Sequence, residues 1–217
     1  MSVLRLCVAS LLFLLPAMAL QAADRPATHA QRDLRALAVQ LRSIGFAKVN
    51  PDASGDVEGR DAEAVLEAAG HAYWFDVETG MFPNEHDGLL RALASLVSPA
   101  LDGATFEEIA PPNDEGPYQL VARMDGKVYR VPAENLGDWY DVTAVLRLLD
   151  TLIAARRADA RLLMLDSDDQ TAVVVGGSRK AVGEALRLGL IRSGNADEPA
   201  AAGKAFEAEA LPSLRAR

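Results

Sequence analysis

Residues 118–131 read YQLVARMDGKVYRV, two runs rich in β-branched and aromatic residues on either side of Asp125-Gly126. An Asp-Gly pair between two such runs is the strongest short-range signal for a β-hairpin. The reason is that both central positions of a type I′ turn need a positive φ angle. This stretch therefore predicts two antiparallel strands joined by a two-residue turn.

The segments that follow the hairpin repeat its organisation. Asp141 stands at the N-cap position of a predicted helix, and residues 161–165 and 171–175 predict a second hairpin. Ser178 then caps another predicted helix. Residues 118–190 thus show the order strand, strand, helix twice. This ββα pattern predicts an α+β fold, a mainly antiparallel sheet with helices on one face.

An N-terminal helical segment precedes this main domain. Residues 28–44 place leucines and an isoleucine at helical spacing, and a short alanine-rich helix is predicted over residues 61–69. We divide the chain into an N-terminal helical segment with an acidic loop over 24–69 and a main α+β domain over 70–193. Residues 194–217 are rich in Ala, Glu and Pro, which predicts a disordered tail.

Residues 1–23 have the organisation of a secretory signal peptide. Arg5 precedes an apolar run over residues 6–15, Pro16 interrupts it, and small residues follow. Cleavage would remove Cys7, the single cysteine, and would leave no membrane anchor. We therefore expect a periplasmic or secreted protein. The excess of arginine over lysine and the many alanines favour a Gram-negative bacterium with a GC-rich genome.

The chain is acidic, with 31 Asp and Glu against 22 Lys and Arg and a formal net charge of −9. A protein that binds nucleic acid or an anionic membrane surface needs a positive surface, so the balance argues against both. It favours recognition of a basic protein partner. The oligomeric state is left open.

Residues 50–61 resemble the calcium loop of an EF-hand or of a dockerin module. Glycine stands at the sixth place, where such a loop turns, and valine at the eighth. The resemblance implies calcium as a cofactor, although asparagine and aspartate occupy the first and last places. A solvated turn between two helices explains the same residues. The candidate ligands are Asn50, Asp52, Ser54, Glu58 and Asp61.

Two further groups are candidate contact residues. Asp138, Trp139 and Tyr140 precede a helix, and if exposed they would form an aromatic contact surface; if buried, Trp139 belongs to the core. The second group crowds carboxylates at the predicted tip of the second hairpin, where a soluble charged turn is the alternative. Its members are Asp166, Asp168 and Asp169.

These observations favour a non-catalytic binding or inhibitor-type protein. The sequence without its leader has no thiol, no histidine pair at the spacing of a zinc helix, and no G-x-S-x-G serine motif. One alternative is a hydrolase of cell-wall or sugar polymers that uses carboxylates such as Asp76 and Asp141. Another is a calcium-responsive accessory protein that uses the 50–61 loop.

Overall fold

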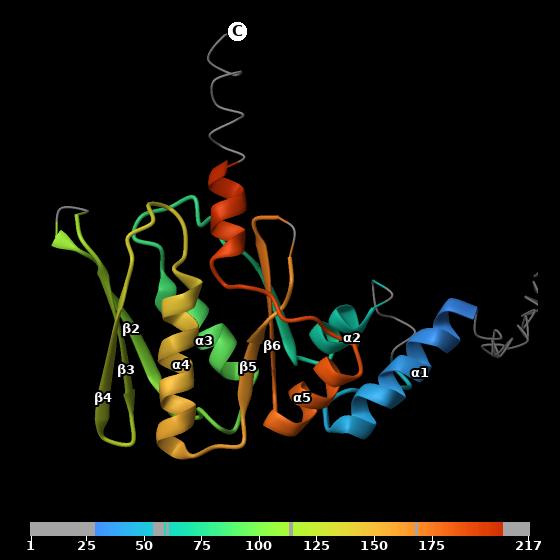
Figure 1. Cartoon of the computed structure of the whole chain (residues 1–217). Coiled ribbons are helices and arrows are strands. Elements are labelled where there is room, and N and C mark those ends of the chain that lie inside the picture. Colours follow the sequence, from blue (N-terminus) through green and yellow to red (C-terminus); the bar gives the residue numbers. More distant parts are fainter. Residues whose placement is uncertain (1–28, 54–58, 60, 113–114, 168, 206–217) are drawn as a thin grey trace, which may run out of the picture.

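The computed structural model describes residues 29–53, 59, 61–112, 115–167 and 169–205, and it shows a mixed α+β fold (Figure 1). The leader at residues 1–23 lies outside the described residues. The elements are α1 (His29–Ile44), α2 (Ala62–Ala68), β1 (Ala72–Asp76), α3 (His86–Ser95), β2 (Thr105–Ile109), β3 (Tyr118–Met124), β4 (Lys127–Ala133), α4 (Val142–Arg156), β5 (Arg161–Met164), β6 (Thr171–Gly177) and α5 (Arg179–Arg187).

The described strands form two three-stranded antiparallel sheets, where the sequence predicted one mainly antiparallel sheet. One sheet has the order β2-β3-β4 and the other the order β1-β6-β5. The two predicted hairpins therefore lie in different sheets. The physical reason is the position of β1. This strand pairs with β6, which lies far from it in the sequence, and so adds a third strand to the second hairpin.

The first hairpin has the predicted turn. Asp125 and Gly126 have φ angles of 53° and 73°, as a type I′ turn requires, and Met124 pairs with Lys127 across it. Glycine adopts a positive φ without strain, and aspartate tolerates it better than most residues, so this pair suits the turn. The local pattern was sufficient because turn and register are both determined by neighbouring residues.

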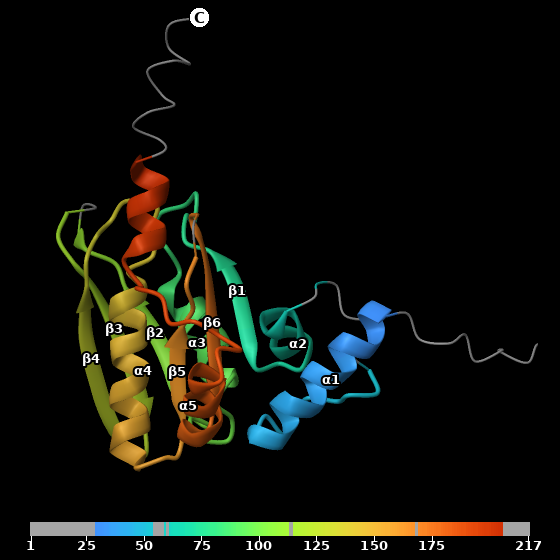
Figure 2. The same ribbon diagram turned by 45° about the vertical axis from the view of Figure 1, so that its right-hand side comes forward.

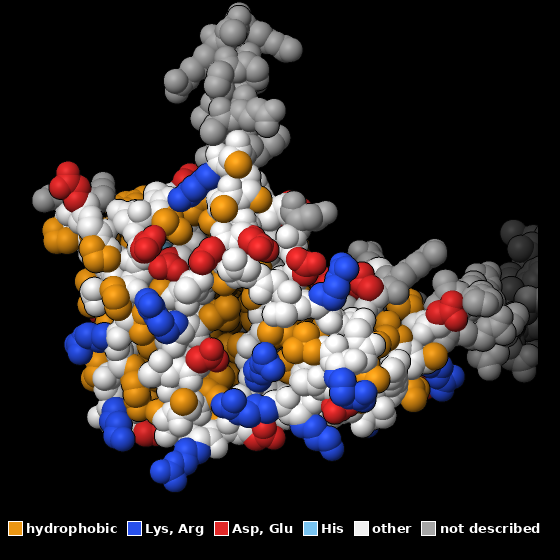
Figure 3. Space-filling view, viewed as in Figure 1, with side chains coloured by type: hydrophobic (Ala, Val, Ile, Leu, Met, Phe, Trp, Pro, Cys, Tyr) orange, Lys and Arg blue, Asp and Glu red, His pale blue; other side chains and the backbone are white. Residues whose placement is uncertain are grey.

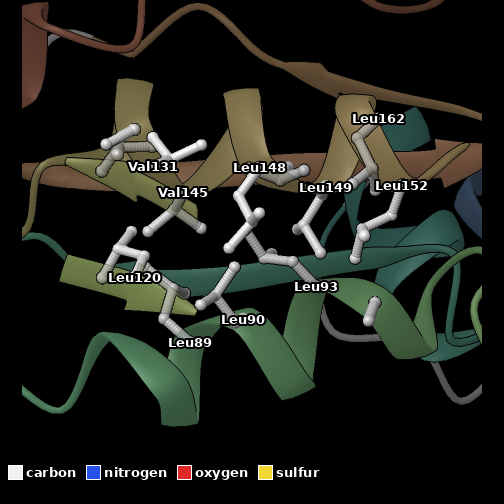
Figure 4. Close-up of a cluster of buried hydrophobic side chains, with 14 of the residues drawn as sticks. Leu89, Leu90, Leu93, Leu120, Val131, Val145, Leu148, Leu149, Leu152 and Leu162 are labelled. Atoms are coloured by element: carbon white, nitrogen blue, oxygen red, sulfur yellow. The ribbon is translucent and has the colours of Figure 1, made fainter. Parts of the chain in front are cut away.

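Helices cover both faces of the β1-β6-β5 sheet, not one face as predicted. Helices α3 and α4 pack between this sheet and the β2-β3-β4 sheet, and their leucines contribute to a large core (Figure 4). Helices α1, α2 and α5 cover the opposite face and form a second core (Figure 2). Neighbouring residues of β6 serve the two cores, since Val174 belongs to the first and Val175 to the second.

The C-terminal region departs from the predicted disorder. Residues 198–205 are helical, Ala200 is buried in the large core, and Gly203 lies directly against the indole ring of Trp139. Contact with this large buried aromatic side chain holds a segment whose composition alone predicted a solvated tail. Residues 206–217 lie outside the described residues.

In the part of the chain that the structure describes, no helix combines the length and apolar character needed to cross a membrane.

Candidate functional site

Three loops meet at one end of the molecule, the upper end in Figure 1. They are the β1–α3, β4–α4 and β5–β6 connections. The Thr79 amide donates to the Asp138 carbonyl at 2.6 Å, which joins the first two loops. The Gln170 side chain donates to the Asp76 carboxylate at 3.2 Å, which joins the first and third.

We call this region the acidic end because of the carboxylates that its loops carry. Asp and Glu side chains cross the upper part of the face in Figure 3, whereas Lys and Arg gather mainly in its lower half. The carboxylates of the acidic end lie on or next to these three loops, except Asp197, which lines a pocket together with Glu134 of the β4–α4 loop. They are Asp76, Glu78, Glu85, Glu134, Asp138, Asp166, Asp169 and Asp197.

Asn84 fastens the first two loops together from within. Its side chain is fully buried, and its amide nitrogen donates to the carbonyls of Gly137 and Trp139, both at 2.9 Å. Its amide oxygen accepts from the Thr79 hydroxyl at 3.0 Å. Because all three bonds are buried or half-buried, the loops are held in one arrangement.

His86 and Glu108 form a second buried connection beneath these loops. The Glu108 Oε2 atom accepts from the His86 backbone amide at 2.7 Å and lies 2.6 Å from His86 Nδ1. The Asp141 amide donates to His86 Nε2 at 3.2 Å. Since Nε2 accepts a hydrogen bond, the proton is on Nδ1, which donates to the Glu108 carboxyl group. The first turns of α3 and α4 meet at this ring.

Aromatic rings enclose His86. The ring centroids of Tyr118 and Tyr140 lie 5.1 and 5.2 Å from that of the imidazole, and the Phe82 ring lies 5.8 Å from that of Tyr118. Burial raises the pKa of the Tyr140 phenol, and the negative charge of Glu85 raises it further. The surroundings of His86 are therefore both apolar and negatively charged.

A groove of about 420 Å³ opens beside this cluster, between the β1–α3 loop and β2. Met81 and Phe82, both substantially exposed, supply much of its apolar surface. Arg91 and Arg123 pair with two of its four carboxylates, so the groove remains negatively charged. We call this site the groove. The residues that line it are Met81, Phe82, Pro83, Phe106, Glu85, Asp87, Glu107 and Glu108.

The structure separates the predicted contact residues. Trp139 is 2% exposed and belongs to the large core, so the prediction of an aromatic contact surface around it is wrong. Asp138 and Tyr140 beside it are half-buried. The bulky ring is needed below the loops, where it fills the space between the first core and the C-terminal helix.

The hairpin tip carries exposed carboxylates. Asp166 lies 3.7 Å from the Arg192 guanidinium, and Asp169 is exposed, whereas Asp168 lies outside the described residues. Hydrogen bonds from Thr171 hold the pKa of Asp169 below its usual range. Both described carboxylates belong to the acidic end.

Two exposed apolar sites were missed from the sequence. Trp74 is 50% exposed, and Met81 and Phe82 are 49% and 39% exposed. The signal for Trp74 was available. Tyr73, Trp74 and Phe75 are consecutive in a strand, so they cannot all face one core.

The described members of the predicted calcium loop have other partners. Asn50 Oδ1 accepts from the Asp52 amide, Asp52 pairs with Arg35 at 2.8 Å, and Asp61 caps α2 through the Ala64 amide. Ser54 and Glu58 lie outside the described residues. Among the residues that are described, no three His, Cys, Asp or Glu side chains converge as metal ligands.

The carboxylates considered for hydrolysis are engaged with the backbone. Asp141 accepts from the Ala144 amide at one oxygen and from the Glu134 amide at the other, both at 2.8 Å. Asp76 accepts from the Glu78 amide and from Gln170. Asp141 thus caps α4 and fixes its loop, which is a structural role.

Comparison of the chain with protein-family models, with curated proteins and with solved structures finds no match.

Proposed function

We propose that this chain is an exported binding protein of the inhibitor type, which acts in the periplasm or outside the cell and recognises a basic protein partner through its acidic end. The observation that carries the proposal is the joint presence of many carboxylates and exposed apolar side chains on loops held by a buried network. Export rests on the signal-peptide pattern of residues 1–23.

Each part of this arrangement has a known role in protein recognition. Apolar and aromatic side chains such as Met81 and Phe82 provide binding energy when a partner excludes water from them. The surrounding carboxylates attract a positively charged partner and disfavour an acidic one. Because Asn84 and His86 already order the loops, little conformational entropy is lost on binding.

Binding to a panel of basic secreted proteins, a lysozyme among them, tests the proposal by surface plasmon resonance. We expect association rates to fall when salt rises from about 50 to about 200 mM, because screening weakens the attraction between the two surfaces. A triple variant with Glu85→Gln, Glu134→Gln and Asp166→Asn should bind at least tenfold more weakly.

A matched triple variant controls for the loss of negative charge. Glu67→Gln, Asp102→Asn and Glu184→Gln remove the same number of charges away from the acidic end, and this variant should bind nearly as the wild type does. Equal weakening by both triples, or binding to no basic protein, contradicts the proposal. N-terminal sequencing of the native periplasmic or secreted material tests the export step, and recovery of intact Met1 contradicts it.

A further inference from the structure

Glu108 is a buried carboxyl group that lines the groove. Its side chain is only 6% exposed, and Oε2 accepts both hydrogen bonds from His86. These bonds fix the position of the carboxyl group at the wall of the groove. The other oxygen, Oε1, has no hydrogen-bond partner among the described residues, and Glu108 lines the groove.

A carboxyl group in a largely apolar groove favours the approach of a cation, because opposite charges attract more strongly where water is excluded. Glu85, exposed on the loop that borders the groove, supplies a second negative charge. The carboxylates of Asp87 and Glu107 are already paired with arginines of the same chain. The two remaining acids therefore define where a positive group from outside would bind.

The apolar lining restricts which cation fits. Phe82 and Phe106 present aromatic rings to the groove, and Met81 and Pro83 add aliphatic surface. A guanidinium is planar, weakly hydrated, able to bind carboxylates through a fork of N–H groups, and favourable against aromatic faces. The methylene groups of an arginine side chain would lie on the apolar surface while its head group meets the acids.

We propose that the groove is a pocket for one arginine side chain of the partner protein, with Glu108 Oε1 and Glu85 as the groups that bind its guanidinium. The proposal rests on the proposed function and identifies the chemistry by which the acidic end recognises its partner. A neighbouring apolar residue of the partner covers Met81 and Phe82.

Nuclear magnetic resonance titration with short peptides tests this pocket. The probes are acetyl-Leu-Arg-Leu-amide, the same peptide with lysine, and the same peptide with citrulline, the uncharged isostere of arginine. We expect the arginine peptide to shift the amide resonances of residues 81–87 and 106–108. The lysine peptide should bind more weakly, and the citrulline peptide at least tenfold more weakly.

Variants identify the binding groups. Glu108→Gln and Glu85→Gln should each weaken the arginine peptide by severalfold, and Glu85→Gln keeps the test valid if the buried substitution prevents folding. Glu67→Gln is the matched control, because it removes an exposed carboxylate outside both the groove and the acidic end. It should leave the affinity for the peptide unchanged.

Equal binding of the arginine and citrulline peptides, or equal weakening by Glu85→Gln and Glu67→Gln, overturns the pocket. These results are separable from failure of the proposed function. Binding of a basic protein without shifts in the groove overturns the arginine pocket alone. Binding of the arginine peptide without binding of any basic protein supports the pocket and contradicts the proposed function.

Discussion

His71 is a buried histidine at the boundary between the N-terminal segment and β6. Its Nδ1 lies 3.0 Å from the Gly176 carbonyl, and the Lys48 amide donates to Nε2, so the ring is neutral with its proton on Nδ1. Burial lowers the pKa of His71, the bond to Gly176 opposes this effect, and the charge of Lys48 adds to it. Protonation of Nε2 would also place its N–H group against the N–H group of the Lys48 amide, so two donors would face each other.

This environment predicts a loss of stability at acidic pH. The unfolded chain binds a proton at His71 with a pKa of about 6.5, above that of the folded state. The contribution is therefore present above about pH 6.5 and is lost as the pH falls through the lower folded-state pKa. In His71→Asn, which retains a side-chain donor, the fall in melting temperature between about pH 7 and pH 5 should be smaller than in the wild type.

Thermal unfolding followed by circular dichroism at both pH values measures this difference. Each protein is compared with itself, so the general cost of the substitution cancels. Identical falls in melting temperature for the two proteins would show that His71 does not couple folding to protonation.

The partners of the buried polar residues could not be predicted from the sequence. His86 contacts Glu108 on β2 and the Asp141 amide at the start of α4, and Asn84 bonds to the 137–139 loop. None of these partners is adjacent in sequence. They meet only because the first core brings α3, α4 and β2 together, so the network beneath the acidic end has no local sequence signal.

At the scale of elements, the helical residues 198–205 make one especially close contact with the core. A Cβ atom placed on Gly203 would lie 2.0 Å from the nearest ring carbon of Trp139, which is far too close. The indole is buried in the core and has little space in which to move. Glycine at this position therefore permits the helix to pack on the acidic end.

Gly203→Leu should release this helix without unfolding the remainder of the chain. We expect hydrogen exchange of residues 198–205 to become faster and the fluorescence of Trp139 to shift to longer wavelength, measured in a Trp74→Phe background. Ala202→Leu is the matched control, because position 202 is exposed on the same helix. Equal effects of the two substitutions would contradict a role for the Gly203–Trp139 contact.

The elements differ in how far local chemistry determined them. The turn at Asp125-Gly126 and the helix caps Asp141 and Ser178 were predicted correctly, since a turn or a cap involves residues only a few positions apart. The tail prediction failed over residues 198–205 because composition measures the tendency to remain solvated and carries no information about a distant tryptophan. The division into two sheets was missed because the pairing of β1 with β6 joins distant segments.

At the scale of the whole molecule, the division into two sheets with α3 and α4 between them places the starts of both helices at the acidic end. The amino terminus of a helix carries a partial positive charge, which stabilises nearby carboxylates. Asp87 lies in the first turn of α3 and Asp141 caps α4. The fold thus tolerates many acids on one side of the molecule, a separation of charge that the net charge of −9 did not predict.

The stability of the two cores is also a property of the whole molecule, because β6 contributes alternate residues to each core. Leu41 of α1 is fully buried in the second core, so Leu41→Ala should lower the free energy of unfolding by about 2–5 kcal/mol. Urea midpoints from circular dichroism and from Trp139 fluorescence, in a Trp74→Phe background, should fall together, as in one cooperative unit. Val39→Ala, at an exposed position of α1, should change stability by under about 0.5 kcal/mol. An unchanged Trp139 midpoint in Leu41→Ala would show instead that residues 24–69 fold separately from the main domain.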